Sequence, residues 1–175
     1  MCRIFMLAAL FISVAAFSQN DKISLHSGKV IEGNVVRVGE FTVVFKYVSE
    51  DAEQTVSKYA VSKITYGKSG REEQVSEKII VNSKDDWEKV VMLVDKSEAA
   101  GLTKAEEVKG KTSLINYRTA AGSNAKAEKD LKQKAAEKGC SFILLTTDKD
   151  ANLGGDNGQG LGGTQTIKAG VAYRY

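Results

Sequence analysis

The first half of the chain alternates apolar and polar residues in short runs, the pattern of β-strands that bury one face. The runs lie at 22–26, 30–38 and 42–48, around Val56, and at 64–66. In the third run, Val43, Phe45 and Tyr47 fall on one face. Glycine-containing turns at 27–29 and 39–40 separate the first three runs. The pattern therefore predicts about five short strands in sequence.

Gly33 interrupts the second run, and Val36 and Val38 after it fall on the opposite parity from Ile31 before it. A glycine inside a strand often marks a bend or a bulge. Five short strands with a bent second strand predict a small β-barrel over residues 19–83, because closure removes exposed strand edges. This stretch resembles an SH3-like or Sm-like barrel in its strand count, its bend and its short link before the last strand. An open sheet that packs on the rest of the chain is the alternative.

Strand and helix patterns mix after Trp87. Expected strands lie at 89–94, where both parities are apolar as in a strand covered on both faces, and at 105–113, 141–147 and 167–175. The intervening stretch 68–86 is polar. We interpret it as the last barrel strands or a linker, with a domain boundary near Ser83.

One helix is expected between these strands. Ser123 or Asn124 can cap it, and it runs to Lys138, where Gly139 stands in the usual terminating position. Its apolar stripe has four-residue spacing and consists of Ala127, Leu131 and Ala135. Alanines let a helix lie close to a sheet. Residues 84–175 therefore predict an α+β domain with one main helix on a mixed or antiparallel sheet, and the chain as a whole is expected to be α+β.

The segment Ala-Ala-Glu-Lys-Gly-Cys-Ser-Phe-Ile-Leu-Leu at 135–145 resembles the "A-A-x-x-G-A-x-x-V" signature of the RcsF/YbjQ-like α+β domains of bacteria. The closing strand at 166–172 is similar to that family's "x-G-x-A" strand. The resemblance covers 87–175 and implies the fold rather than the activity. Cys140 stands where the family has a small apolar residue, and the disulfides of the family's envelope stress sensor cannot form here.

The amino-terminal pattern indicates export. A short basic start containing Arg3 precedes an apolar run at 4–17, and small residues up to Ser18 fit signal-peptidase cleavage. The alternative to a signal peptide is a transmembrane anchor, but this run is shorter than the roughly 20 residues that a membrane-spanning helix needs. We therefore expect a signal peptide at 1–18, a periplasmic or secreted mature chain at 19–175, and no transmembrane helix in that mature chain.

Charge and cysteine content narrow the function classes. The chain has 25 Lys and Arg against 22 Asp and Glu, and loss of Arg3 with the signal would leave 24 against 22. Both signs are interspersed, whereas nucleic-acid binding usually requires clustered basic residues, so no nucleic-acid partner is expected. Cleavage also removes Cys2, so Cys140 would have no disulfide partner within the chain and stability must come from packed cores.

Two residues could carry chemistry. Cys140 is a candidate redox or metal-binding thiol, but the carboxyl end of a helix disfavours the reactive thiolate, so we interpret it as a small buried side chain. His26 is the one histidine of the chain. His26 and Cys140 alone are too few ligands for a zinc site. Any Ser-His-Asp or Cys-His arrangement would also need His26, which is expected on a different domain from Cys140. We expect it on the surface at the end of a strand.

A glycine-rich segment at 152–163 contains the literal pattern G-x-G-x-x-G at 158–163. The pattern leads into a strand rather than a helix, which argues against phosphate binding. Oxygen-bearing residues at alternate positions resemble the start of a calcium loop: Asp148, Asp150 and Asn152, with Asp156 and Asn157 nearby. Leu153 and Gln159 occupy the positions where such a loop needs glycine and glutamate. We therefore expect a long solvated connection from Asp148 onward, and calcium binding stays open.

These observations predict an exported, non-enzymatic cell-envelope protein that recognises a partner protein or a small ligand. No catalytic residue, cofactor site or metal site is assigned. The alternative is an oligomeric scaffold, or a small-ligand or metal-binding assembly, built through the second domain, and a homo-oligomer is compatible with either role. An exposed apolar groove would favour recognition, and a symmetric apolar interface would favour assembly.

Overall fold

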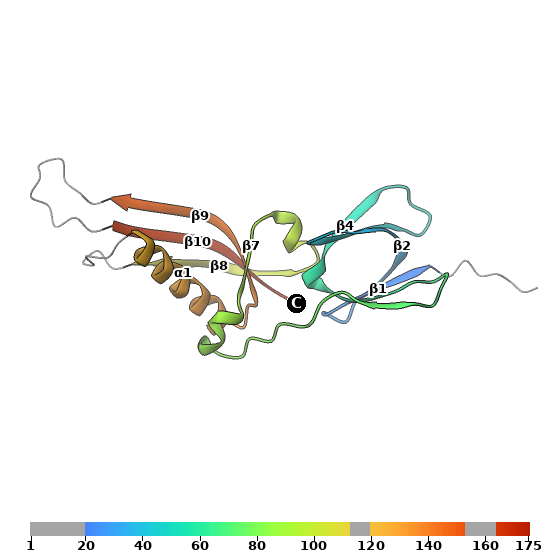
Figure 1. Cartoon of the computed structure of the whole chain (residues 1–175), viewed down its shortest axis with the longest axis horizontal. Coiled ribbons are helices and arrows are strands. Elements are labelled where there is room, and N and C mark those ends of the chain that lie inside the picture. The colour runs from blue at the N-terminus through green and yellow to red at the C-terminus, as the bar shows by residue number, and fades with distance from the viewer. Residues whose placement is uncertain (1–19, 113–119, 153–163) are drawn as a thin grey trace, which may run out of the picture.

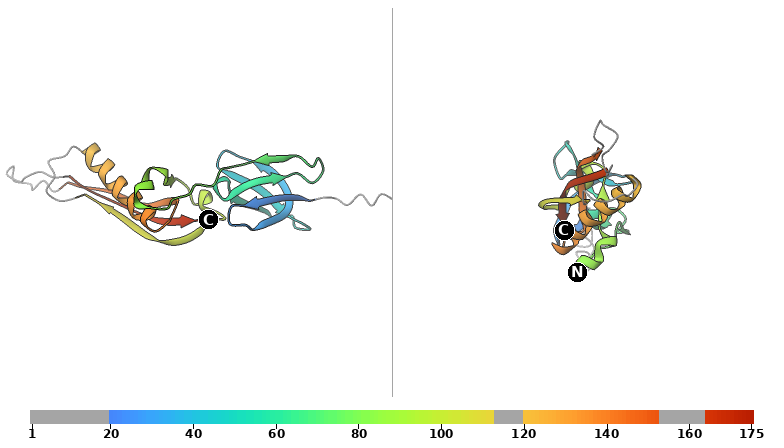
Figure 2. Two further views of the ribbon diagram at one scale, coloured as in Figure 1. Left: turned by 90° about the horizontal axis from the view of Figure 1, so that it is seen from below. Right: turned by 90° about the vertical axis from the view of Figure 1, so that its left-hand side faces the viewer.

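The computed structural model describes residues 20–112, 120–152 and 164–175. The predicted signal peptide lies outside the described residues. Two sheets lie end to end along the long axis, and an α-helix covers one face of the second sheet (Figures 1 and 2). The chain is therefore α+β, as the sequence predicts.

The first sheet has six antiparallel strands in the order β4-β3-β2-β1-β5-β6. The strands are β1 (Asp21–Leu25), β2 (Val30–Val38), β3 (Thr42–Tyr47), β4 (Glu53–Ser57), β5 (Val61–Thr65) and β6 (Glu72–Gln74). A one-turn 3-10 helix, η1 (Lys58–Ala60), joins β4 to β5. The sheet packs its apolar residues around Ile23, Val43 and Ile64, which are fully buried.

The described strands of this sheet do not close into a barrel, so the expectation of closure is wrong. In the strand order, β4 and β6 each have one neighbour. The chain leaves β4 through η1, and the backbone N–H of Ser57 donates to the carbonyl of Ala100, in the second half of the chain, at 2.9 Å. A segment from the second half thus lies against the end of β4. The arrangement is the open-sheet alternative, while the SH3-like resemblance stays a prediction.

The bend expected at Gly33 is displaced. The β2–β3 register shifts between Val35 and Arg37, so the bulge follows the glycine. At Gly33 itself, an added Cβ would lie 2.2 Å from the carbonyl oxygen of Lys46. This glycine therefore allows two backbones to approach closely, which is the second common role of glycine in a strand.

The second sheet has four strands in the order β7-β9-β10-β8, with β7 parallel to β9 and the other pairs antiparallel. Its elements are η2 (Lys84–Lys89), β7 (Val91–Leu93), η3 (Lys96–Ala99), β8 (Thr103–Lys111), α1 (Ala120–Glu137), β9 (Phe142–Asn152) and β10 (Thr164–Arg174). The strand expected at 89–94 is only three residues long. Lys89 belongs to a 3-10 helix and Val94 is 89% exposed, so the apolar run at 89–94 does not form a strand over its whole length.

Helix α1 packs on β8 and β10 through the predicted stripe, and Ala127, Leu131 and Ala135 are fully buried. Gly139 has φ +66, the left-handed conformation of a helix-terminating glycine, and the helix ends at Glu137, one residue before the predicted Lys138. The beginning is wrong, since the helix starts at Ala120, before both proposed caps. In the part of the chain that the structure describes, no helix is long and apolar enough to cross a membrane.

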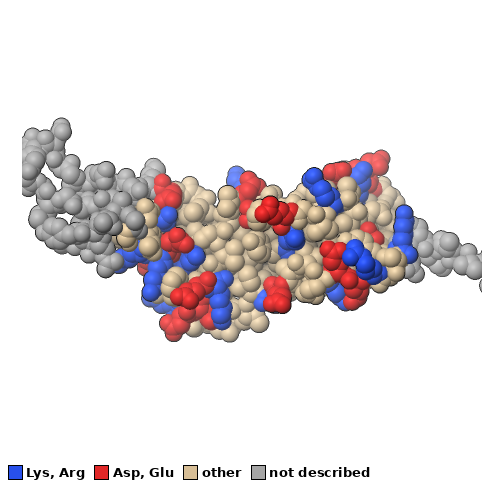
Figure 3. Space-filling view, in the orientation of Figure 1, with Lys and Arg blue, Asp and Glu red and all other residues tan. Residues whose placement is uncertain are grey.

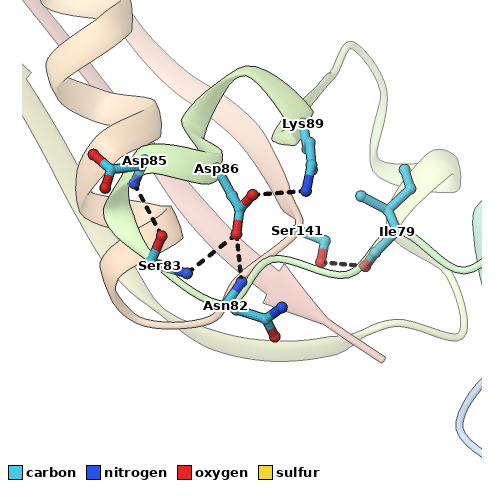
Figure 4. A network of polar contacts seen from close by, with 7 residues as sticks. All are labelled: Ile79, Asn82, Ser83, Asp85, Asp86, Lys89 and Ser141. Atoms are coloured by element: carbon cyan, nitrogen blue, oxygen red, sulfur yellow. Dashed lines mark hydrogen bonds and ion pairs between the residues drawn. The ribbon is translucent and has the colours of Figure 1, made fainter.

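The connection between the sheets runs along both of them. The backbone carbonyl of Ile79 accepts a hydrogen bond from the Ser141 hydroxyl at 2.9 Å (Figure 4). Val81 lies in the core beneath α1. Ser83 then caps η2 with a reciprocal capping box that it forms with Asp86. The chain has therefore joined the second half at Ile79, before Ser83. The division into folding domains at residue 83 stays a prediction.

Candidate functional site

A hollow of about 360 Å³ opens on the inner face of the first sheet, beside the junction with the second half. Its floor is apolar and is made by Leu25, Ile31, Phe45 and Val56, all buried. Its rim is formed by polar and aromatic residues, namely Ser27, Lys29, Tyr47, Gln54 and Thr55. We refer to this hollow, with these residues and Gly101 and Thr103, as the groove.

The groove exists because strand alternation places apolar side chains on the curved inner face. Val43, Phe45 and Tyr47 share this face as predicted, but only the first two are buried. Tyr47 is 36% exposed and makes an edge-on contact with Phe45 at 5.1 Å between ring centroids. An exposed aromatic ring at the mouth of an apolar hollow is a feature of binding surfaces.

The opposite lip comes from the second half of the chain. Gly101 adopts φ +84, and an added Cβ would lie 2.6 Å from a methyl group of Val56. A glycine is therefore required for the close approach of this turn to β4, and it leads directly into exposed Thr103 at the start of β8. The groove is thus built from both halves of the chain.

A second hollow, of about 470 Å³, lies at the other end of the first sheet and is more polar. Its carboxylate, Asp21, accepts backbone N–H groups from Val35 at 2.8 Å and Gly67 at 2.9 Å. Its guanidinium, Arg71, stacks over Tyr66 and pairs with Glu73 at 2.9 Å. These side chains hold the sheet together, so we assign them a structural role.

A third hollow, of about 590 Å³, runs along α1 and is lined mainly by charged and polar residues, among them Lys111, Lys129 and Asp130. Asp130 accepts the backbone N–H of Lys111 at 3.1 Å and pairs with Lys134 at 2.8 Å. Lys129 lies over the Trp87 ring, 4.8 Å from its centroid. Since Asp130 and Lys129 already have partners, the groove is the better candidate site.

Cys140 is fully buried in the core beneath α1, as predicted. Burial raises the pKa of its thiol, which keeps it in the unreactive protonated form. Its sulfur lies 3.8 Å from the carbonyl oxygen of Lys138. The interpretation of Cys140 as a packing residue is confirmed.

His26 follows the end of β1 as predicted, but it is half-buried rather than on the surface. Its Nε2 lies 2.9 Å from the Ser76 hydroxyl, and its ring makes an edge contact with Tyr175 at 4.9 Å. Burial, together with the nearby Lys78 ammonium, lowers the pKa of this histidine. The partial burial of His26 was not predictable from the sequence, because Ser76 and Tyr175 come into contact with His26 only in the folded chain.

The segment expected to be a long connection from Asp148 onward is partly strand. β9 continues to Asn152 and β10 begins at Thr164, so Asp148, Asp150 and Asn152 lie in a β-ladder. Asp148 forms an ion pair with Lys168 at 2.9 Å. Backbone fixed in a ladder does not fold into an EF-hand-type loop. Asp156, Asn157 and the pattern at 158–163 lie outside the described residues.

Within residues 20–112, 120–152 and 164–175, no group of three or more His, Cys, Asp or Glu side chains is placed to hold a metal ion. Figure 3 shows lysines and arginines interspersed with acidic residues over the visible face. This distribution agrees with the alternation of charge along the sequence.

The groove was not predicted from the sequence. The only local signal was an alternating strand with tyrosine at its last inward position, Tyr47, which also fits an ordinary core strand. The lip at Gly101 carries no recognisable motif, because its role depends on contact with Val56. Comparison of the chain with protein-family models, with curated proteins and with solved structures finds no match.

Proposed function

We propose that this chain is an exported, non-enzymatic recognition module that binds a partner of the cell envelope through the groove. One observation carries the proposal: an open hollow with a buried apolar floor and an exposed tyrosine at its mouth. Such a surface favours an apolar ligand group surrounded by polar contacts. Export rests on the amino-terminal pattern at 1–18.

The test is selection of ligands from a display library of random linear peptides, followed by titration of the selected peptides by fluorescence anisotropy. Thr103→Arg would place a long side chain over the mouth of the groove from an exposed position. We expect it to weaken binding by at least about tenfold. Asn82→Arg adds the same charge at an exposed site outside the groove and should leave binding unchanged. Equal binding by both variants, or a library that yields no ligand, would refute recognition through the groove.

Assembly through the second sheet is the other candidate role. Ala172 faces α1 and is fully buried, so strand alternation places Ile167, Ala169 and Val171 on the opposite, helix-free face. These three residues are only half-buried and form an apolar stripe along β10. A mass measurement in solution decides the matter. A dimer that Val171→Lys converts to a monomer would support assembly, and a monomeric wild-type chain would exclude it.

A further inference from the structure

We propose that the groove takes its partner as an extended peptide that adds a strand to the open edge of β4. The inference rests on the proposed function and names the class of ligand. The occupant would be a linear segment of another protein that pairs with the backbone of β4 and inserts alternate side chains into the groove.

The backbone of β4 shows which groups are available. Lys58 donates its N–H to the carbonyl of Phe41 at 2.9 Å, continuing the register in which Val43 opposes Val56. Antiparallel ladders alternate between hydrogen-bonded and non-hydrogen-bonded pairs. Gln54 and Val56 therefore bond to β3 through their backbones, while the N–H and C=O groups of residues 53, 55 and 57 point away from the sheet.

The N–H of Ser57, at the last residue of β4, already forms a bond of the proposed kind. The Ser57 N–H donates to the carbonyl of Ala100 at 2.9 Å, so the second half of the chain begins to pair with this edge. Gly101, with φ +84, then turns the chain away. Glu53 and Thr55 remain exposed, and no described strand pairs with them. A peptide strand beside Thr55 would continue an interface that the protein itself has started.

The position of the groove defines the side chains of this peptide. Gln54 and Val56 face the inner side of the sheet together with Phe45, and all three line the groove. A strand added beside β4 directs every second side chain to this same side. The ligand is therefore an extended segment with apolar residues at alternate positions and free backbone groups opposite Thr55. Recognition by strand addition uses this combination of main-chain bonds and alternate side-chain pockets.

Thr55→Pro tests the pairing directly. Proline removes the outward N–H of residue 55 and places a ring at the edge, but it removes no bond to β3, and proline is tolerated on edge strands. Thr55→Val keeps the N–H and serves as the matched control. With the peptides selected from the random library, we expect Thr55→Pro to bind about tenfold more weakly than Thr55→Val, which retains the N–H. Circular dichroism and the thermal midpoint report whether both variants fold.

Peptide variants provide a second measurement on the wild-type protein, which holds even if Thr55→Pro does not fold. Each backbone nitrogen of a selected peptide is methylated in turn. Strand addition predicts weakening at alternate positions, because only every second N–H points at β4. Equal binding of all methylated peptides, or full binding by a folded Thr55→Pro variant, would overturn strand addition. If Thr103→Arg still abolished binding in that case, recognition through the groove would stand without it.

Discussion

The Tyr175 hydroxyl accepts a hydrogen bond from the backbone N–H of Ile79, with 3.0 Å between oxygen and nitrogen. The Tyr175 ring lies edge-on to His26 at 4.9 Å and to Phe142 at 5.3 Å. One side chain thus contacts the first sheet, the second sheet and the segment that connects them. This contact and the pairing of Ser57 with Ala100 both join the two halves of the chain.

Replacement of Tyr175 by phenylalanine should lower the free energy of unfolding by about 1 kcal/mol. The ring contacts are kept, but the partly buried N–H of Ile79 loses its acceptor. Urea denaturation measures the difference. Tyr173→Phe, two residues earlier on β10, is the control and should change the free energy by less, because no hydrogen bond of its hydroxyl occurs among the described side chains. Equal effects of the two substitutions would show that the Ile79 bond contributes nothing.

His26 should make the stability of the protein depend on pH. The Ser76 hydroxyl donates to the Val61 carbonyl at 2.7 Å, so it accepts from His26, and the neutral ring carries its proton on Nε2. Folding lowers the pKa of His26 through burial and through Lys78, so the unfolded chain takes up the proton more readily. The contribution of the neutral ring is complete above the ordinary pKa of about 6.5 and is lost as the pH falls through the lower folded pKa.

We therefore expect the free energy of unfolding to fall between about pH 7 and pH 5. His26 is the one histidine of the chain, and histidine is the side chain that ordinarily titrates in this window. His26→Gln retains a hydrogen-bond donor but does not titrate. Urea denaturation across this range should show a smaller slope for the variant. Parallel pH profiles for the two proteins would contradict the assignment.

Gly110→Ala should destabilise the protein by about 1–3 kcal/mol, the usual cost of overpacking. An added Cβ would lie 2.1 Å from the backbone carbonyl oxygen of Ala127 and 2.8 Å from the backbone nitrogen of Leu131, and helix backbone cannot move aside as a side chain does. Gly28→Asn is the control. Gly28 has φ +88, a conformation that asparagine tolerates, and no atom lies within 4 Å of its added Cβ. A smaller loss at Gly110 than at Gly28 would contradict direct helix–strand contact.

The periodicity of apolar residues in the sequence was sufficient to predict those elements whose structure depends on a local rule. Strand β2 has the predicted bounds, and α1 ends shortly before Gly139 because left-handed backbone favours glycine regardless of the rest of the fold. The stripe of α1 was correct for the same reason, since i,i+4 spacing is a property of the helix itself.

Features that depend on contacts distant in sequence were not predictable. Barrel closure depends on what lies beside β4. The Ala100 carbonyl, which accepts the N–H of Ser57 at the end of β4, is 43 residues away in the chain. Gly33 and Gly110 look alike in sequence, yet one accommodates the backbone of a strand and the other that of a helix. The groove has the same origin, because its two lips come from separate halves of the molecule.

The ion pair between Asp148 and Lys168 joins directly opposed residues of β9 and β10. Lys168 lies on the side of β10 that faces α1, and its side chain is only 10% exposed, whereas that of Asp148 is 52% exposed. The two partners therefore differ in what their removal leaves behind. Loss of the lysine leaves a carboxylate in contact with water, and loss of the carboxylate leaves an ammonium group that water reaches poorly.

Asp148→Asn should accordingly lower the free energy of unfolding by about 1–2 kcal/mol, because a nearly buried charge loses its counterion. Lys168→Met should be close to neutral, since methionine fills a similar volume and removes the cost of desolvating the ammonium group. The double variant should then be more stable than Asp148→Asn alone. Urea denaturation of the four proteins forms a complete double-mutant cycle. If Asp148→Asn were as stable as the wild type, or if Lys168→Met were the more destabilising change, the burial of Lys168 would not explain how this ion pair contributes to the free energy of unfolding.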